Sequence, residues 1–539
     1  TIQKYGEKHC YLKHIITLNT CSDIDGAVVE SYDTEKEVLL AWTQLIHNLD
    51  PDIITGYNIF GFDFSFMWHR AEELECLDDF CKLGRVRHQF NDEETNILSN
   101  DTRKSRLEIK KLASSALGDN LLKYITMDGR IVMDLFKIVQ KDFNLVSYKL
   151  DYVAENFIND KIKDIDDNRL IIDGIITLNK GHFITINYGH DKKYKKRKFK
   201  IISIDFETKN ITINYNIPED DKKEIMASRP KWTLAKDDVS PKDIFRLQDG
   251  SADDRKIVAT YCIQDCALCN NLIDKLKIIT NNIGMANVCF VPISYLFLRG
   301  QGVKIFSLVS NQCRKDGFLV PVLKYDKEEI IVKDDFKKFE YGECDDTENL
   351  DNEESYEGAI VLDPIPDIYL EESITVLDYA SLYPSSMIGD NISQDSIVLD
   401  NGESEKYMDE EGKKLLEELG YGVEDITRDV FKWKNPKIKS QGKVKCGKKT
   451  CRFVQPLDGS KAVIPRILEN LLSARKNTRK KIKYKSVVFN NKTSEVYGLL
   501  SESKCGDMYI ITDENGKKTE VKKTNVDEIL DKYNDFEKS

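Results

Sequence analysis

The segment from Val376 to Ser385 constrains the fold of this chain more than any other. The apolar run from Ile374 to Leu377 predicts a short buried strand, and Asp378 follows it directly. A turn closed by Pro384 comes next. A strand-end carboxylate followed by free backbone amides and an aromatic ring suits the joint binding of a metal ion, a triphosphate and a sugar. The alternative for a lone Asp in this place is a simple turn former.

Composition limits the number of domains and the kinds of partner that the chain can have. A chain of 539 residues is too long for one core, so roughly three or four domains are expected. The net charge of −12 argues against a protein that binds nucleic acid over its whole surface, although a local basic groove is enough for an enzyme. Two stretches, Lys192 to Lys200 and Arg475 to Lys485, are strongly basic. The acidic stretch 333–355 predicts a surface linker.

The remaining composition points to the compartment. No apolar run reaches the roughly 18 residues that a membrane span requires, and no signal-peptide pattern opens the chain. The 13 Cys residues lack the regular spacing of a secreted disulfide framework. We therefore expect an intracellular protein, with no membrane among its partners.

Apolar periodicity predicts the element order. An α/β pattern opens the chain, and a Lys- and Ile-rich stretch follows between about 160 and 235. The expected strands are His14–Leu18, Ile53–Ile54 and the hairpins over 200–215 and 508–521; the expected helices cover Glu35–Leu49, 132–139, 152–157, 253–279 and a segment that starts near Pro465.

The string around Asp378 resembles the first palm motif, Asp-x-x-Ser-Leu-Tyr-Pro-Ser, of family B DNA polymerases. The resemblance implies that Asp378 is a metal ligand and that the amides near Ser381 and Leu382 meet the phosphates of a nucleotide. It also implies that Tyr383 lies under the deoxyribose and excludes a 2′-hydroxyl by its bulk. Without the resemblance, a core aromatic beside a proline turn is the simpler interpretation of Tyr383.

A basic helix supports the same family. Arg475 and Arg479 are four residues apart, hence on one helix face, and a guanidinium suits phosphate oxygens. A solvated basic face is the alternative. The segment resembles the first fingers helix, whose two cations bind the triphosphate, although Lys is usual at the second place. Tyr356, Gly358 and Ala359 resemble the Tyr-x-Gly-Gly/Ala element that contacts template DNA.

A second set of motifs indicates a nuclease. Phosphodiester hydrolysis with two metal ions needs converging carboxylates and a group that orients water. Asn58 to Asp63 follows a predicted strand, and Tyr261 and Asp265 share a helix face. Taken alone, each motif is typical of a solvated helix face. Together they resemble the second and third exonuclease motifs of the same family, with the segment from Asp134 to Phe136 as a landmark between them.

The exonuclease resemblance implies roles for five residues. Asp63 and Asp265 hold metal, Tyr261 orients the attacking water, and Asn58 and Phe62 contact DNA. The cofactor implied at both the exonuclease and the polymerase centre is Mg²⁺ in a two-metal site.

Several family motifs are missing, so both Mg²⁺ sites are incomplete in this chain. The first exonuclease motif, Asp-x-Glu, does not precede the second. Asp205-Phe-Glu207 has the right letters but falls in a predicted hairpin turn. The second fingers helix and the Tyr-Gly-Asp-Thr-Asp hairpin are also absent, and Asn490 to Gly498 does not fit the helix because it places an acid where a triphosphate would bind. We therefore expect an internal fragment of a longer protein, inactive by itself.

The resemblance implies an α/β and α+β multidomain fold: an RNase H-like 3′-5′ exonuclease domain, a ferredoxin-like palm and the start of a helical fingers domain. The expected bounds are 1–285 for the exonuclease domain with an insertion at about 165–225, 286–355 for a connecting segment, 356–455 for the palm and 456–539 for the fingers with a Lys-rich insertion.

The implied function is that of a DNA-directed DNA polymerase with proofreading, of the delta-like branch and similar to those of large DNA viruses. Its implied partners are primer-template DNA and deoxynucleoside triphosphates, with a sliding clamp as an open further partner. A non-catalytic polymerase-like protein that binds DNA or acts as a scaffold is the alternative. A stand-alone nuclease is disfavoured, because residues 356–483 would then have no purpose.

Overall fold

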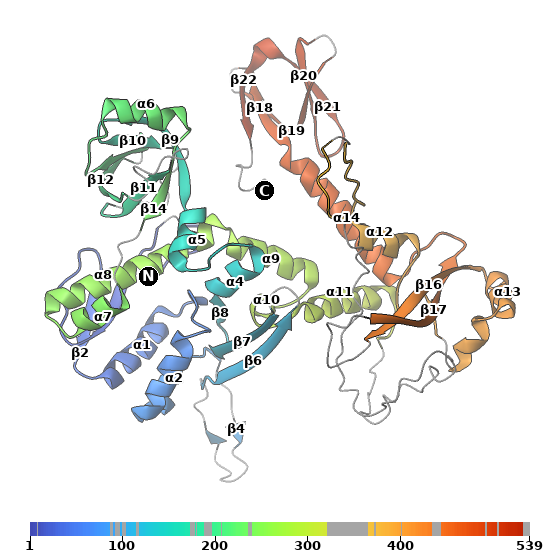
Figure 1. Ribbon diagram of the computed structural model, residues 1–539, viewed down its shortest axis with the longest axis horizontal. Coiled ribbons are helices and arrows are strands. Elements are labelled where there is room, and N and C mark those ends of the chain that lie inside the picture. Colours follow the sequence, from blue (N-terminus) through green and yellow to red (C-terminus); the bar gives the residue numbers. More distant parts are fainter. Residues whose placement is uncertain are drawn as a thin grey trace. The chain divides into compact units, whose positions relative to one another are not determined.

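The computed structural model mixes helices and strands along its whole length (Figure 1). It divides into two compact units, Thr1–Leu308 and Val309–Ser539, and each is described by itself. The structure describes residues 1–7, 9–86, 90–91, 98–99, 104–114, 118–172, 178, 180–187, 197–205, 207–235, 240–320, 365–370, 373–399, 402–433, 443–490, 493–503 and 506–531.

Two pairs of parallel strands open the first unit. β1 (His14–Leu18) pairs with β2 (Val28–Tyr32), and β3 (Ile53–Gly56) pairs with β8 (Ile131–Asp134). The predictions of a strand over 14–18 and of another at 53–54 are confirmed.

The helix predicted over 35–49 is also confirmed, as α1 (Glu35–Leu49). It begins with a capping box, in which the Glu37 N–H donates to the Thr34 hydroxyl at 3.3 Å and the Thr34 N–H donates to the Glu37 carboxylate at 3.1 Å. These reciprocal bonds satisfy two backbone donors that would otherwise have no partner at the helix start.

The helix predicted over 132–139 begins later than expected. Val132 and Met133 are buried in β8, and α4 covers Leu135–Asp142. Asp134 caps α4, because its Oδ1 accepts the Phe136 N–H at 2.9 Å. A short apolar run is compatible with a strand or a helix, and here the neighbouring strand β3 favours the strand.

The other helices of this unit include those predicted over 152–157 and 253–279. The second is split in two, because Lys277 adopts a positive φ of 52° between α8 and α9. The helices are α2 (Asp63–Glu73), α3 (Leu77–Phe80), α5 (Leu150–Phe157), α7 (Pro241–Gln248), α8 (Ala252–Lys275), α9 (Ile278–Cys289), α10 (Ile293–Leu298) and α11 (Gln301–Asp316), which continues into the second unit. Two hairpins, β4 (Phe90–Asn91) with β5 (Leu98–Ser99) and β6 (Leu107–Ser114) with β7 (Gly118–Ile125), complete the set. In the described part of the chain, no helix is both long and apolar enough to cross a membrane.

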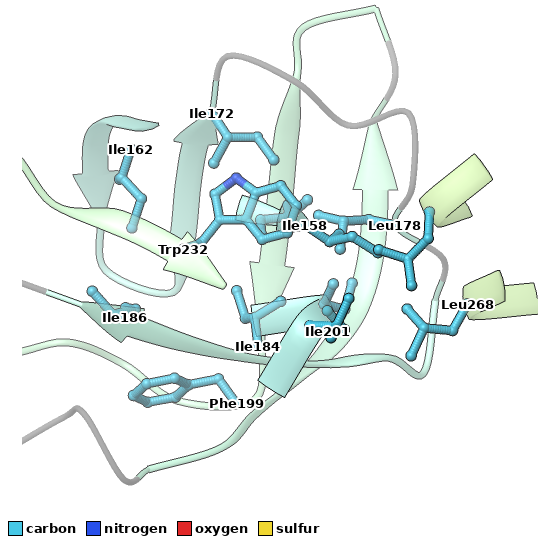
Figure 2. Packing of buried hydrophobic residues seen from close by; sticks show 14 of the residues in the cluster. Ile158, Ile162, Ile172, Leu178, Ile184, Ile186, Phe199, Ile201, Trp232 and Leu268 are labelled. Atoms are coloured by element: carbon cyan, nitrogen blue, oxygen red, sulfur yellow. The ribbon is translucent and has the colours of Figure 1, made fainter. Parts of the chain in front are cut away.

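A closed barrel of six strands lies between α5 and α7. The strand order around it is β10-β13-β12-β11-β14-β9, so the first and last strands along the chain are neighbours. The strands are β9 (Asn159–Asp166), β10 (Arg169–Ile172), β11 (Phe183–Asn187), β12 (Phe199–Asp205), β13 (Asn210–Ile213) and β14 (Lys231–Ala235), with α6 (Glu219–Ala227) before the last. Figure 2 shows Trp232 and Phe199 among the isoleucines of its core, with Leu268 of α8 beside them.

The hairpin predicted over 200–215 is confirmed as β12 and β13, with Ile204 opposite Ile211. Asp205 closes its turn, because Oδ1 accepts the N–H groups of Glu207 at 3.0 Å and Thr208 at 3.2 Å. The Asp205-Phe-Glu207 letters therefore serve a turn, as predicted.

A three-stranded sheet forms one part of the second unit, in the order β15-β17-β16. Its buried Arg452 makes a bidentate pair with Asp425, at 2.7 and 2.6 Å, and reaches the Tyr407 carbonyl at 2.9 Å. The elements are α12 (Leu382–Gly389), β15 (Ile397–Val398), the 3-10 helix η2 (Gly402–Tyr407), α13 (Glu410–Glu418), β16 (Tyr421–Trp433) and β17 (Lys443–Pro456).

A long helix and a five-stranded sheet form the other part. The predicted helix is confirmed as α14 (Val463–Ile482), with Pro465 in its first turn. The sheet order is β21-β20-β19-β18-β22 around Val487, Ile511 and Val521. Its elements are β18 (Tyr484–Phe489), β19 (Ser494–Glu502), β20 (Met508–Thr512), β21 (Lys518–Lys522), the 3-10 turn η4 (Lys523–Asn525) and β22 (Val526–Asp531). The predicted hairpin over 508–521 is β20 with β21, and residues 494–498 are strand, not helix.

The prediction of a buried strand at Ile374 to Leu377 is wrong. The segment forms no strand, and Ile374 is 66% and Leu377 90% exposed. An apolar run becomes a strand only where a neighbouring strand pairs with its backbone, and within the described residues none does. The acidic stretch 333–355 and the strands expected from Tyr356 lie outside the described residues.

Candidate functional site

The first candidate site begins where β3 and β8 end. These parallel strands are in register, with Gly56 opposite Asp134, so the segments that follow them start at the same edge. The Asp134 carboxylate is 1% exposed. It accepts the N–H groups of Asn58 at 2.8 Å and Phe60 at 3.0 Å, besides that of Phe136. One buried side chain thus organises the loop that carries the predicted DNA-contacting residue Asn58.

This loop is tightly wound. Asn58 has a positive φ of 63°, and its carbonyl accepts the Gly61 N–H at 3.0 Å and the Phe62 N–H at 3.1 Å. A Cβ at position 61 would lie 2.3 Å from the Asn58 Oδ1 atom, so a larger residue there would push the Asn58 side chain aside. The turn delivers Asp63 to the first position of α2.

The structure brings Asp63 and Asp265 into one neighbourhood. The Cys266 side chain keeps contact with solvent, yet the protein atoms around it raise the pKa of its thiol. The nearby charges of Asp265 and Asp63 raise that pKa further. Both predicted ligands therefore lie within electrostatic range of the Cys266 thiol.

The environments of the two carboxylates fit a cation. The protein atoms around Asp63 raise the pKa of its carboxyl, and a backbone hydrogen bond offsets part of that shift. The Oδ1 atom of Asp265 is also shielded from solvent. Tyr261 lies one turn earlier on the same helix, α8, as predicted.

Asp63 and Asp265 alone would offer a metal ion few ligands. Among the described residues, no three His, Cys, Asp or Glu side chains gather closely enough to hold a metal ion. Two carboxylates nevertheless fit Mg²⁺, which proteins commonly bind through one or two carboxylates plus water and substrate phosphates.

Exposed aromatic rings stand next to Asp63. Phe62, the N-cap residue of α2, is 62% exposed, and Phe66, in the first turn of the helix, is 52% exposed. Their rings stack with centroids 5.7 Å apart and planes 10° apart. The pair presents a flat apolar surface of the kind on which nucleobases stack. Phe62 was predicted to contact DNA; Phe66 was not singled out.

The second candidate site is built around α12. Asp378 is exposed in the extended segment before the helix. Ser381 has a positive φ of 56° and precedes the first helical residue, Leu382, whose amide lies at the positive end of the helix. Tyr383 is 71% exposed, so it is not the core aromatic of the simpler interpretation.

The predicted cations lie on the neighbouring helix. Arg475 and Arg479 are exposed on α14, and α12 packs against α14 within the same unit. Among the described residues neither guanidinium pairs with a carboxylate, so both are available to an anion.

The turn between α12 and β15 ties the two helices together. Asn391 is 1% exposed; its amide group donates to the Val454 carbonyl at 2.9 Å and accepts the Ala462 N–H at 2.8 Å. The Asp395 carboxylate accepts the Val463 N–H at the start of α14. Sequence reasoning missed both residues; a signal was available for Asp395, because an Asp next to a Ser is a typical capping side chain.

The predicted template-contacting residues Tyr356, Gly358 and Ala359 lie outside the described residues. From the sequence, Asp134 is only a landmark between the two exonuclease motifs. Its position at the end of a buried apolar run was the signal that it belongs to the same edge as Asn58.

Comparisons with known proteins point to one family. A family model described as DNA polymerase family B, exonuclease domain, matches residues 1–153, and one described as DNA polymerase family B matches residues 291–496. A DNA polymerase of Pyramimonas orientalis virus is 44% identical over 539 residues, which is all of this chain and 39% of the relative. A DNA polymerase of Phaeocystis pouchetii virus is 34% identical, over 89% of this chain and 45% of the relative.

A cellular relative matches a similar region. The DNA polymerase delta catalytic subunit of Dictyostelium discoideum is 28% identical over 89% of this chain and 30% of its own length. The chain thus spans less than half the length of each of these relatives.

Proposed function

The chain belongs to DNA polymerase family B, and we propose on that premise that it acts in a DNA-directed DNA polymerase with a 3′-5′ exonuclease. The proposed substrates are primer-template DNA and deoxynucleoside triphosphates. The observation that carries the proposal is the segment from Asp378 to Tyr383, which leads into α12, a helix that packs against α14, the helix of Arg475 and Arg479.

For the polymerase centre, we propose that the start of α12 and the exposed face of α14 bind one triphosphate. The amides at Ser381 and Leu382 suit phosphate oxygens because they lie at a helix N-terminus. Arg475 and Arg479 add guanidinium groups, whose planar set of N–H donors suits phosphate oxygens. The exposed ring of Tyr383 is free to lie against the sugar, where its bulk would exclude a 2′-hydroxyl.

Asp378 is the proposed ligand for Mg²⁺ at this centre. When bound, the ion would neutralise charge on the triphosphate and on the attacking oxygen. The exposed carboxylate of Asp378 is an accessible hard oxygen donor, as such an ion requires.

For the exonuclease centre, we propose that Asp63 and Asp265 hold Mg²⁺ and that Tyr261 orients the attacking water through its hydroxyl. Asn58 would bind the end of the DNA strand by hydrogen bonds, and Phe62 by stacking. Two carboxylates within electrostatic range of the same thiol, and the stacked rings of Phe62 and Phe66 next to Asp63, support this assignment.

The finer fold belongs to the same proposal. We assign an RNase H-like exonuclease domain to 1–285, a connecting segment to 286–355, the palm to 356–455 and the first part of the fingers to 456–539. The likeness to delta catalytic subunits also makes a sliding clamp a proposed partner.

The test uses the protein expressed from its complete reading frame. We expect Mg²⁺-dependent primer extension and Mg²⁺-dependent degradation of single strands from the 3′ end. Asp378→Ala should abolish only the first activity and Asp63→Ala only the second. A protein that binds primer-template DNA without either activity would be a non-catalytic relative, and the proposal would fail.

A further inference from the structure

Asp134 occupies an unusual place for a carboxylate. It ends a buried strand, it is 1% exposed, and it lies below the loop from Asn58 to Gly61. Burial raises the pKa of its side chain, while the N–H groups of Phe60, Asn58 and Phe136 lower it. A buried carboxylate is costly without such donors, so the loop and the carboxylate stabilise each other.

The two oxygens of this carboxylate hold different parts of the loop. Oδ1 accepts the Asn58 N–H at 2.8 Å and the Phe136 N–H at 2.9 Å, and Oδ2 accepts the Phe60 N–H at 3.0 Å. Asn58 is thereby tied to the start of α4. Phe60 is held separately, with its ring 1% exposed in the core.

Two functional positions depend on this loop. Asn58 belongs to it, and Asp63 follows it as the first residue of α2. The loop has little freedom of its own, because the Asn58 carbonyl accepts the N–H groups of both Gly61 and Phe62. A shift of Phe60 would therefore displace Asn58 and Asp63 together.

We propose that Asp134 is a positioning residue for the 3′-5′ exonuclease centre: it fixes the loop that places Asn58 and Asp63, without touching DNA or metal itself. The inference rests on the proposed exonuclease function. Precise placement matters for such a centre, since displacement of a reacting group by about 1 Å can lower a rate by roughly 100-fold.

The test is Asp134→Asn in the protein expressed from its complete reading frame. An amide keeps one acceptor oxygen for Asn58 and Phe136, but it turns an NH₂ group toward the Phe60 N–H, so that one bond is lost. The matched control is Ile165→Ala, which opens the barrel core at a fully buried residue far along the chain from the loop.

Two measurements test the effect of Asp134→Asn. Hydrogen exchange followed by mass spectrometry should show faster exchange in a peptide spanning 57–62 for Asp134→Asn and unchanged exchange there for Ile165→Ala. Single-strand degradation should lose at least about 10-fold in kcat with little change in KM in Asp134→Asn only. Primer extension, which uses the other centre, should match the wild type and so report on intact folding.

Opposite results would overturn the inference. Unchanged exchange at 57–62, a wild-type kcat, or an equal loss of both activities would each do so. If Asp134→Asn does not fold, Gly61→Ala displaces the same loop from the other side and should give the same fall in kcat; a wild-type kcat there would refute the role of the loop. A wild-type protein that degrades no DNA would instead overturn the proposed exonuclease itself, as would full degradation by Asp63→Ala.

Discussion

Asp395 and Val463 join two helices of the second unit: both oxygens of the Asp395 carboxylate accept the Val463 N–H, at 3.1 and 3.3 Å. Asn391 accepts the preceding N–H, and the Ser393 hydroxyl accepts the following one, from Ile464, at 3.3 Å. Three side chains after α12 therefore satisfy three donors at the start of α14. These three side chains thus connect α12, the helix with Tyr383, to α14, the helix with Arg475.

Asp395→Ala should weaken the connection between α12 and the start of α14. Loss of a capping side chain costs about 1 kcal/mol of the free energy of unfolding, so the thermal transition of the protein should fall slightly. We also expect a higher KM for deoxynucleoside triphosphates, because α14 would no longer be fixed beside α12. Asp395→Asn is the control, since Asn caps helices as well as Asp. Equal KM values for the two variants would contradict the role of the cap.

Asp378→Ala should lower primer extension by more than about 100-fold while the affinity for primer-template DNA stays the same. The reason is that loss of a direct metal ligand exceeds the roughly 10- to 100-fold cost of losing a group that only supports one. Steady-state extension and a DNA titration measure the two quantities. Asp367→Ala, at another exposed acid before α12, should behave like the wild type. Substantial extension by Asp378→Ala would disprove the metal role.

Arg475→Ala should raise the KM for the incoming nucleotide by about 10-fold or more, because a hydrogen bond to a charged group contributes roughly 1.5 to 3 kcal/mol. Arg479→Lys should change it less, since the charge is kept. Lys476→Ala removes a neighbouring charge from a different helix face and serves as the control. If all three variants shift KM equally, the effect is general electrostatics and not phosphate binding.

Trp232→Ala should destabilise the barrel by about 3 to 5 kcal/mol through the cavity that it leaves. Trp232→Phe should cost much less. The indole Nε1 is buried and has no hydrogen-bond partner among the described residues, so Phe removes an unsatisfied donor together with part of the ring. Calorimetric unfolding compares the two. Equal losses would mean that the indole N–H finds an acceptor in solution.

His182 gives the barrel a pH dependence. Burial, and then the charge of Lys13, lowers the pKa of His182 from 6.5 to about 4. Between these values the unfolded chain carries a proton on His182 that the folded chain lacks. Stability from this residue is therefore complete above pH 6.5 and is lost as the pH falls toward 4, by roughly 3 kcal/mol in total.

Urea unfolding of the wild type and of His182→Gln at several pH values between 7.5 and 4 measures this contribution. The variant cannot titrate at this position, so its stability should fall less as the solution is acidified. Parallel curves for the two proteins would show that His182 titrates normally.

Local chemistry explains which elements could be predicted. The helix over 35–49 carries its own start signal in Thr34 and Glu37, and Pro465 marks the first turn of α14. Each of these signals needs only residues within one helical turn. The hairpin of β20 and β21 is likewise specified by the short turn between them.

Non-local pairing explains what could not be predicted. The run from Ile374 to Leu377 has the composition of a strand, but pairing decides, and none exists among the described residues. The barrel was visible only as a Lys- and Ile-rich stretch with one hairpin. Its closure depends on β9 meeting β14, from the two ends of that stretch.

The same limit applies to the sites. Asp63, Asp265 and Tyr261 could be named from the spacing of their motifs. The sequence could place Asp134 at a strand end, but it could not show the bonds that make Asp134 and Asn391 important, because the backbone partners reach them only after folding.

The neighbouring first and last strands of the barrel also bear on how this protein could have acquired it. Lys161 of β9 pairs with Lys231 of β14, so the chain leaves the barrel beside the point where it entered. The exonuclease family model ends at residue 153, just before β9. A gene segment that encodes a domain whose two ends are adjacent can be gained or lost in one event. The rest of the fold need not change, because the two flanking ends stay side by side. The contacts of the barrel core with α5 and α8, such as those of Val153 and Leu268, would then need to be adapted after the event.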